Sequence, residues 1–335
     1  MEVRKEIGTR PKVLLTRALT REAMGLLQHN FDLTVGNDHR MLTRGELLEK
    51  VRGKDALITM LADRVDGKLL DAAPGLKIVA NYAVGYNNIE VPATLDRGIP
   101  VIHTPGVLTQ ATADTAFALL LAVARRIVEA HAYVVSGKFT AWKPDLLLGL
   151  ELTGKQMGIV GMGRIGQAFA ARCLGFGMKI YYTSRSRLPK EREETLKAKY
   201  LPLDDLLQQS DFVSLHVPLT RETYHMIDAR RLRMLKSEAI LINTSRGPVV
   251  DETALVTCLK ERCIRGAGLD VYENEPQVPE ALKRLDNCVL LPHIGSATEE
   301  ARFKMAEILR DGLVDFFEGR RPHTLIPEWK RFLTS

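Results

Sequence analysis

The chain has 335 residues, of which 45% are hydrophobic and 26% are charged. This length allows two domains of ordinary size, and the composition is typical of a globular protein. Lysine and arginine exceed aspartate and glutamate, which gives a net charge of +6. Because the basic residues are scattered and mixed with acids, we expect no nucleic-acid partner.

Location and redox state are predicted from the same sequence. No stretch reaches the ~20 apolar residues that a membrane span needs, so we expect no membrane partner. The segment Met1–Arg10 is charged and lacks the apolar core of a signal peptide, which favours a cytoplasmic protein. The four cysteines show neither CxxC spacing nor a zinc-type pairing with histidine, so we expect reduced thiols and no metal site.

The first hundred residues alternate short apolar runs with helical patterns. Strands are predicted over residues 13–16, 56–59 and 78–80, and helices over residues 21–29 and 68–73. This βαβ rhythm predicts a parallel sheet.

A long helix is predicted over residues 110–136. Leu119, Leu120 and Val123 lie on one apolar stripe of this helix, and the stripe is a candidate dimer face. The segment 137–153 carries glycine, proline and tryptophan, so we expect it to be a connection.

A second alternating series begins at Gln156. Its candidate strands are short apolar runs separated mostly by helical patterns, and they cover residues 156–160, 178–183, 211–216, 239–243, 264–269 and 288–291. Six parallel strands that begin with a glycine turn are typical of a doubly wound domain. The chain closes with a helical pattern over residues 299–319, which we expect to return to the first domain.

The sequence GMGRIG, residues 161–166, follows the first strand of this second series and opens a helix. In such a turn Gly161 permits the tight bend, Gly163 lets the backbone approach a pyrophosphate, and Gly166 lets helix and strand pack closely. Amides at the helix N-terminus then face the anion. The motif alone is weak, but its strand–turn–helix context predicts a dinucleotide site.

The turn about 20 residues further on distinguishes the two forms of the cofactor. An acid there would bind both ribose hydroxyls and repel a 2′-phosphate, but residues 182–187 read YTSRSR and hold no acid. Arg185 can pair with a phosphate dianion, and Ser184 and Ser186 can complete the shell around it. The turn therefore predicts NADP(H); if these residues only form a solvated turn, the site would not distinguish NADP(H) from NAD(H).

Together these patterns predict an α/β protein with two doubly wound parallel-sheet domains and a ligand cleft between them. Residues 106–298 are expected to form a Rossmann-type, NADP-binding domain. Residues 1–105 and 299–335 are expected to form a flavodoxin-like, substrate-binding domain.

Seven longer motifs are spread over nearly the whole chain. They are NYAVGYNNIEV (81–91), VIHTPGVLTQATADTAFALLLA (101–122), GIVGMGRIGQAFA (158–170), HVPLTRETYHMI (216–227), LINTSRGPVVDETAL (241–255), GAGLDVYENEP (266–276) and LLPHIGSAT (290–298). Jointly they are specific, and with them the chain resembles the D-isomer-specific 2-hydroxyacid dehydrogenases, and within that family the glyoxylate/hydroxypyruvate reductases. The resemblance implies reduction of a small 2-oxo acid, such as glyoxylate to glycolate or hydroxypyruvate to D-glycerate.

The resemblance implies a catalytic Arg, Glu and His, which match Arg246 in TSRG, Glu275 in ENEP and His293 in PHIGSA. The chemistry needs a hydride at C2 and a proton for the forming alkoxide. His293 can act as the acid, because histidine titrates near the operating pH. Glu275 can orient the ring and favour its protonated form. Arg246 can clamp the substrate carboxylate through its planar fork.

The resemblance also implies ligand contacts. The substrate is expected at the backbone amides of Val84 and Gly85, and at Arg246, His293 and Trp142. The expected cofactor contacts lie in the glycine turn, the ribose turn and the segments after later strands, namely Gly161, Met162, Gly163, Arg164, Ile165, Gly166, Ser184, Arg185, Ser186, His216, Val217, Pro218, Thr244, Ser245, Arg246, Asp270, His293, Ile294 and Gly295. His103 and His216 lie beside strands and could instead be structural.

Members of this family are usually dimers through the region that follows the long helix, so a homodimer is expected. Trp142 lies there in the polar sequence GKFTAWKPDLLLG, residues 137–149. One interpretation makes it an anchor that packs on its own chain. The other places it across the dimer axis, where it closes the partner's substrate cleft and excludes long substrate side chains.

Other functions are compatible with the same motifs. Within the family, the alternatives are a 2-ketogluconate reductase and a phosphoglycerate-type dehydrogenase, although the latter usually carries an added regulatory domain for which 335 residues leave no room. Formate dehydrogenases replace the glutamate by glutamine, so Glu275 argues against them. A co-repressor on this fold can keep the catalytic residues, but the NADP-type turn disfavours it.

Overall fold

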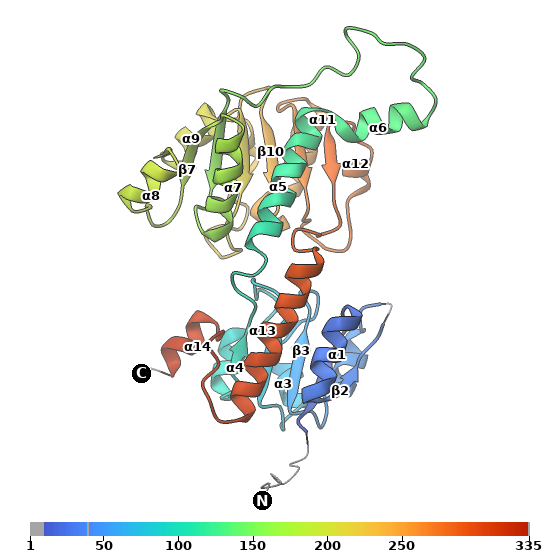
Figure 1. Ribbon diagram of the computed structural model, residues 1–335, viewed down its shortest axis with the longest axis vertical. Helices are drawn as coiled ribbons and strands as arrows, with labels where there is room; N and C mark the ends of the chain where they lie inside the picture. The colour runs from blue at the N-terminus through green and yellow to red at the C-terminus, as the bar shows by residue number, and fades with distance from the viewer. Residues whose placement is uncertain (1–9, 39, 334–335) are drawn as a thin grey trace, which may run out of the picture. The chain divides into compact units, whose positions relative to one another are not determined.

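The structure is a computed structural model that describes residues 10–38 and 40–333. Residues 1–9, on which the expectation of no signal peptide depends, lie outside this range. The chain divides into two compact units, one formed by Met1–Leu108 with Thr298–Ser335 and the other by Thr109–Ala297 (Figure 1). None of the described helices is both long and apolar enough to cross a membrane.

The first unit holds a five-stranded sheet and helices from both ends of the chain. Its strands are β1 (Lys12–Leu15), β2 (Asp32–Val35), β3 (Ala56–Thr59), β4 (Ile78–Asn81) and β5 (Val101–Ile102). Its helices are α1 (Arg21–Asn30), α2 (Arg44–Lys50), α3 (Gly67–Ala72), α4 (Val91–Asp96), α13 (Glu299–Phe317) and α14 (Pro327–Phe332).

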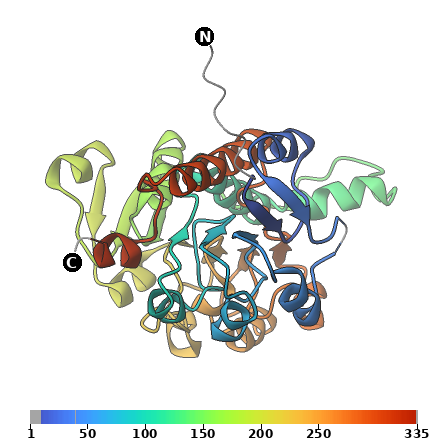
Figure 2. The same cartoon turned by 90° about the horizontal axis from the view of Figure 1, so that it is seen from below.

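The strands of the first unit are all parallel, in the order β2-β1-β3-β4-β5, which is the flavodoxin-like order. Helices cover both faces, with α1 and α13 packed together on one of them (Figure 2). The return of the C-terminal helix to the first domain is thereby confirmed. Sequence patterns missed β2 and β5, because β2 is a partly exposed edge strand and β5 has only two residues.

The second unit holds a seven-stranded parallel sheet. Its strands are β6 (Gln156–Val160), β7 (Lys179–Thr183), β8 (Ala198–Tyr200), β9 (Phe212–Leu215), β10 (Ile240–Asn243), β11 (Gly266–Leu269) and β12 (Cys288–Leu290). Its helices are α5 (Thr109–Ala124), α6 (Ile127–Val135), α7 (Arg164–Gly175), α8 (Lys190–Thr195), α9 (Leu203–Gln209), α10 (Ala229–Leu232), α11 (Glu252–Lys260) and α12 (Glu280–Lys283), with a short 3₁₀ turn at Gly247–Val249.

The strand order β12-β11-β10-β9-β6-β7-β8 is the Rossmann order extended by one strand. The predicted fold class, two parallel-sheet α/β domains, is therefore confirmed. The six strands expected in this unit are present, and the seventh, β8, was missed because it is a three-residue edge strand within a charged segment.

The sheet of the second unit is buried on both faces, which explains why its strands read as continuous apolar runs. In β10, Ile240 and Ile242 point into the layer under α5 and α7, whereas Leu241 points into the opposite layer under α9 and α11. Figure 1 shows α5 and α7 lying together over one face of this sheet. The packing on both faces therefore holds the carboxyl ends of these strands in fixed positions.

The single helix predicted over residues 110–136 is wrong, because the structure has two helices, α5 and α6. In a continuous helix the Ala124 carbonyl would accept from the Val128 N–H. Here it accepts from the Leu150 N–H at 2.8 Å. Arg126 adopts a left-handed conformation at φ 53° and begins α6, where its guanidinium pairs with Glu129. The returning connection thus ends the first helix.

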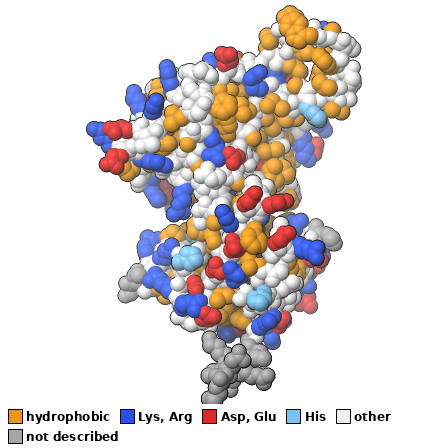
Figure 3. Space-filling view, in the orientation of Figure 1, with side chains coloured by type: hydrophobic (Ala, Val, Ile, Leu, Met, Phe, Trp, Pro, Cys, Tyr) orange, Lys and Arg blue, Asp and Glu red, His pale blue; other side chains and the backbone are white. Residues whose placement is uncertain are grey.

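The proposed dimer face on that helix also needs correction. Leu119, Leu120 and Val123 are at most 9% exposed and belong to the core of their own unit. A run of exposed apolar side chains lies further on, in α6 and the connection after it, at Ile127, Val128, Val134, Val135, Phe139, Trp142 and Leu148. Figure 3 shows apolar side chains gathered over this projecting arm, residues 127–149.

Candidate functional site

The candidate site of the second unit lies at the carboxyl ends of its parallel strands. Site residues predicted from sequence follow successive strands, namely Gly161 after β6, Ser184 after β7, His216 after β9, Thr244 after β10 and Asp270 after β11. Strand order reverses between β6 and β9. In doubly wound sheets, ligands bind at this edge beside the reversal, which is where the glycine turn lies.

The glycine turn has the geometry that a pyrophosphate cradle needs. Gly161 has φ 98°, and a Cβ there would lie 2.4 Å from the His216 carbonyl oxygen. A Cβ on Gly166 would lie 2.1 Å from the Gly161 carbonyl oxygen. A Cβ on Gly163 would meet nothing within 4 Å, so the space over the start of α7 is open. Two glycines are therefore required by packing, and the third leaves room for a ligand.

His216 packs inside this edge rather than titrating there. Its Nε2 lies 2.9 Å from Ser214 Oγ, and its ring lies 5.0 Å from the ring of Phe169. Burial lowers the pKa of His216 to about 3, so the ring is neutral near pH 7. These contacts fit a structural imidazole under the turn, and a cofactor contact at this position stays a prediction.

The ribose turn leaves one arginine available. Ser184 Oγ donates to the Ser186 carbonyl oxygen at 2.6 Å, which closes the turn. Arg187 forms an ion pair with Glu193, and its Nε lies 2.8 Å from Glu193 Oε1. Arg185 is exposed and makes no hydrogen bond or ion pair with any residue that the structure describes. The charge of Arg185 contributes to the lowered pKa of Glu222, but no hydrogen bond or ion pair among the described residues would have to break for a 2′-phosphate to bind Arg185.

Asn243, the last residue of β10, shapes the segment that carries Arg246. Its Oδ1 accepts from Ser245 N–H at 3.0 Å and from Ser245 Oγ at 2.7 Å, and its Nδ2 donates to the Arg246 carbonyl oxygen at 3.0 Å. Next to it, the hydroxyl of Thr244 is buried and lacks a partner among the described residues. A bound ligand could use this hydroxyl.

The guanidinium of Arg246 is largely enclosed and mostly unpaired. Nη1 donates to the Ser245 carbonyl oxygen at 2.6 Å, which is its one hydrogen bond within residues 10–38 and 40–333. Burial lowers the pKa of Arg246, and the charge of Glu275 opposes that shift. Since an arginine stays charged, its unused donors suit the carboxylate of a ligand.

Glu275 and His293 form a hydrogen-bonded pair. Glu275 Oε2 lies 2.7 Å from His293 Nδ1, and Glu275 Oε1 accepts from the Tyr272 N–H at 3.0 Å. Burial would raise the pKa of Glu275, but the hydrogen bond and charge of His293, with smaller contributions from Tyr272 and Arg246, hold it below its usual value. Because an ionised carboxylate only accepts, Nδ1 carries the shared proton, and Nε2 remains for a ligand.

The backbone of His293 is held from the next strand. Asp270, at the end of β11, accepts from the Ile294 N–H and the Gly295 N–H, both at 2.7 Å. These bonds fix the segment in which His293 takes the uncommon φ of 56°. Burial raises the pKa of Asp270, and the two amides oppose this shift. In the structure Asp270 thus positions the His293 loop, and its predicted cofactor contact stays a prediction.

In the first unit, the loop after β4 carries two amides, those of Val84 and Gly85, that face no acceptor among the described residues. The Val84 carbonyl oxygen accepts from His103 Nδ1 at 2.8 Å, and the Gly85 carbonyl oxygen accepts from Asn81 Nδ2 at 2.7 Å. The amides of Val84 and Gly85 have no hydrogen-bond partner within the described part of the chain. Such a loop, with fixed carbonyls and open N–H groups, suits an anion. The predicted structural role of His103 fits these contacts.

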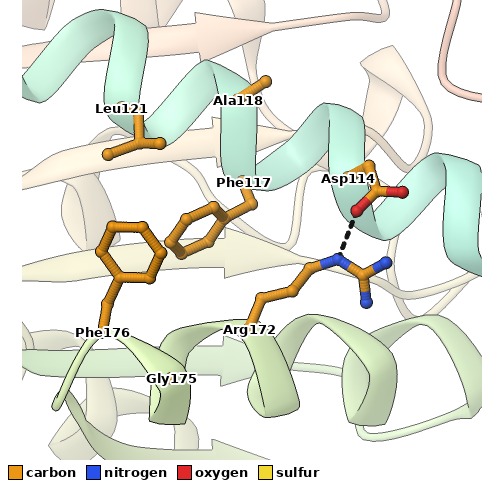
Figure 4. A pocket seen from close by; sticks show the side chains of 7 residues that line it. All are labelled: Asp114, Phe117, Ala118, Leu121, Arg172, Gly175 and Phe176. Carbon is orange, nitrogen blue, oxygen red and sulfur yellow. Dashed lines mark hydrogen bonds and ion pairs between the residues drawn. The ribbon is translucent and has the colours of Figure 1, made fainter.

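A cavity of about 410 Å³ lies apart from all these groups, on the outer side of α5 and α7 (Figure 4). Phe117 and Phe176 form its apolar wall, and Arg172 Nε pairs with Asp114 at 2.6 Å along its rim. None of the site residues predicted from sequence lines it.

Trp142, in the arm, is 78% exposed, so it does not pack as an anchor on its own chain.

Comparison with known proteins assigns the family. Residues 117–295 match the model of the NAD-binding domain of the D-isomer-specific 2-hydroxyacid dehydrogenases. The glyoxylate reductase of Thermococcus litoralis is 54% identical over 330 residues, which cover 97% of this chain and 99% of that protein. The chain therefore belongs to the D-isomer-specific 2-hydroxyacid dehydrogenase family, and it is an NAD(P)-dependent oxidoreductase.

Solved structures agree with this assignment. The TT0316 protein from Thermus thermophilus is 46% identical, with a TM-score of 0.88, and the match covers 94% of this chain and 99% of that one. The NADPH-dependent glyoxylate/hydroxypyruvate reductase of Sinorhizobium meliloti, solved with NADP and malonate, is 35% identical. Its TM-score is 0.84, and the match covers 96% of this chain and 98% of that one.

Sequence analysis missed the residues that hold the predicted site residues in place. Asn81 and Asn243 each close a buried parallel strand and bond the loop that follows. A polar residue at the end of an apolar run was a usable signal, because that end borders the ligand edge of the sheet. Asp270, Ile294 and Gly295 were predicted as cofactor contacts, but the hydrogen bonds between them join residues 24 and 25 positions apart and gave no local signal.

Proposed function

We propose that this protein reduces a small 2-oxo acid with NADPH, converting glyoxylate to glycolate and hydroxypyruvate to D-glycerate. The observation that carries the proposal is the Glu275–His293 pair, at 2.7 Å, near the enclosed and largely unpaired Arg246. The names of its relatives in Thermococcus litoralis and Sinorhizobium meliloti support the same substrates.

Each of the three side chains has a distinct chemical task in this proposal. Arg246 binds the substrate carboxylate and polarises the adjacent carbonyl. The bound cofactor supplies the hydride to C2. His293 donates the proton on Nε2 to the carbonyl oxygen, which becomes the hydroxyl, and Glu275 stabilises the imidazolium that makes this donation possible. The amides of Val84 and Gly85, which are free in the described chain, add donors for the carboxylate.

NADPH is the preferred cofactor in this proposal because of the ribose turn. Arg185 is exposed and has no hydrogen bond or ion pair with the residues that the structure describes, and residues 184–187 after β7 include no acid. The open space at Gly163 and the amides at the start of α7 suit the pyrophosphate. The residues present therefore fit the group, with the second unit as the cofactor domain and the first as the substrate domain.

The protein is further proposed to be a homodimer joined through the arm, residues 127–149. None of the α6 side chains is buried within the chain, and Val135 and Trp142 are 72% and 78% exposed. A second copy would cover this apolar surface, and Trp142 would then act at the partner's substrate site. A rigid ring there would admit glyoxylate and hydroxypyruvate and exclude bulkier 2-oxo acids.

Arg185→Ala should lower kcat/KM for NADPH by about tenfold or more, because hydrogen bonds to a charged group contribute roughly 1.5–3 kcal/mol. The same change should hardly affect NADH, which has no 2′-phosphate. Steady-state kinetics with both cofactors measures the two effects. Arg187→Ala is the matched control, since Arg187 is already paired with Glu193. An NADPH preference that survives Arg185→Ala would refute this assignment.

His293→Ala should lower glyoxylate turnover by about 10²–10⁴-fold, the usual contribution of a general acid. NADPH binding, measured by fluorescence titration, should change little. Near-parental turnover in this variant would show that the proton comes from another group.

Glu275→Gln should move the alkaline limit of reduction to lower pH. The pKa of Glu275 lies below its usual value, so the carboxylate is ionised and stabilises the protonated imidazole. Glutamine lacks that charge, so reduction, which needs the donated proton, should fail at a lower pH. A pH–rate profile measures the shift, and a profile equal to the parent's would contradict the pairing.

Trp142→Ala should keep NADPH affinity and the dimeric state but accept bulkier 2-oxo acids. A mixed dimer of one Trp142→Ala chain and one His293→Ala chain tests whether the ring acts on the partner. Its only competent site lies on the Trp142→Ala chain and would borrow an intact Trp142 from its neighbour, so parental selectivity is expected. Relaxed selectivity in the mixed dimer would place the ring at its own chain's site.

A further inference from the structure

The loop that carries Glu275 begins with two buried residues, Val271 and Tyr272. It follows β11 and is pressed against Gly247, where a Cβ would lie 1.9 Å from the Tyr272 carbonyl carbon and 2.4 Å from the Glu273 nitrogen. Tyr272 Oη also donates to the Leu291 carbonyl oxygen at 2.8 Å. The place of Glu275 therefore depends on how firmly residues 272–275 are held.

One support for this loop is a buried carboxylate on a neighbouring helix. Glu252, the first residue of α11, is 9% exposed, and its Oε1 accepts from the Glu273 N–H at 3.1 Å. Burial raises the pKa of Glu252, and the charges of Glu273 and Glu275 act in the same direction. Burying a carboxylate beside two others costs free energy, and the hydrogen bond from the Glu273 N–H offsets part of that cost.

The second support is a histidine from the loop after β9. His225 Nε2 lies 2.9 Å from Glu273 Oε1, and the His225 N–H donates to the Pro248 carbonyl oxygen at 2.8 Å. The ring of Tyr224 stacks on the ring of His225, with centroids 4.1 Å apart. His225 thus joins the segment after β9, the segment that carries Arg246 and the loop that carries Glu275.

We propose that Glu252 and His225 are positioning residues, which together clamp Glu273 and so hold Glu275 in hydrogen-bond contact with His293. Neither needs to touch the substrate or the cofactor, since both act on the backbone and side chain of Glu273. This inference rests on the proposed roles of Glu275 and His293.

The clamp works through hydrogen bonds and not through the charge of Glu252. A carboxylate, a protonated carboxyl group and a glutamine amide can all accept from the Glu273 N–H. Glu252→Gln should therefore preserve the clamp, whereas Glu252→Ala should release it. The Glu252→Gln variant thus separates the hydrogen bond from the charge of Glu252.

The first experiment compares Glu252→Ala, Glu252→Gln and the control Glu261→Ala, an exposed glutamate at the other end of α11. Glu252→Ala should lower kcat for glyoxylate by up to about 10²-fold, since small misplacements of reacting groups reduce rates this much. The Kd of NADPH should stay within about twofold of the parent's. Glu252→Gln and Glu261→Ala should keep near-parental kcat. A Glu252→Gln enzyme as slow as Glu252→Ala would overturn the proposal.

His225→Ala provides a second variant in case Glu252→Ala does not fold. His225 is partly exposed, so its loss should disturb the core less, and it removes the other of the two supports. Its kcat should fall, with unchanged NADPH binding, while Tyr224→Ala, at a 54% exposed neighbour, should have a smaller effect. Parental kcat in both His225→Ala and a folded Glu252→Ala would overturn the clamp.

Hydrogen exchange separates failure of the clamp from failure of the proposed function. Exchange across residues 270–276 should be faster in Glu252→Ala and His225→Ala than in Glu252→Gln, with the rest of the second unit unchanged. Unchanged exchange in the first two variants would overturn the clamp whatever their activity. An active His293→Ala enzyme with faster exchange in the clamp variants would instead uphold the clamp and reject the acid assignment.

Discussion

The hydrogen bond between His293 Nδ1 and Glu275 Oε2, 2.7 Å long, is the interaction that the rest of the site is arranged to maintain. Its two partners lie on different loops, so each loop needs its own support. Asp270 holds the His293 segment through two backbone amides, and Gly247 lets residues 272–273 pack without a gap. With Nδ1 engaged, Nε2 is the atom left for chemistry.

A parallel sheet gives this arrangement its rigidity. The strands of the second unit are buried on both faces, so their carboxyl ends are fixed in register, and the loops that follow begin from fixed points. Arg246, Glu275 and His293 follow β10, β11 and β12, three neighbours in the sheet. Side chains far apart in sequence therefore meet at one edge, as expected for a doubly wound fold.

Much of the fold follows from local pattern, and the errors have physical causes. Apolar runs predicted the central strands, because these are buried on both faces. Short edge strands such as β8 were missed, and the break at Arg126 was invisible because the bond that ends α5 comes from Leu150. At the site, the sequence motifs predicted Arg246, Glu275 and His293 as the catalytic residues. Asn243 ends a strand that the sequence predicted, but its bond to the Arg246 segment and the bonds from Asp270 to the His293 segment are seen only in the structure. The ligand cleft expected between the domains stays a prediction.

A crystal structure with NADP⁺ and oxamate, an unreactive analogue of a 2-oxo acid, would test the proposed chemistry most directly. We expect the oxamate carbonyl oxygen within hydrogen-bond distance of His293 Nε2, with Nδ1 still on Glu275, and the oxamate carboxylate on the guanidinium of Arg246. An analogue bound away from His293, or a ring turned so that Nε2 faces Glu275, would contradict the assignment of His293 as the acid.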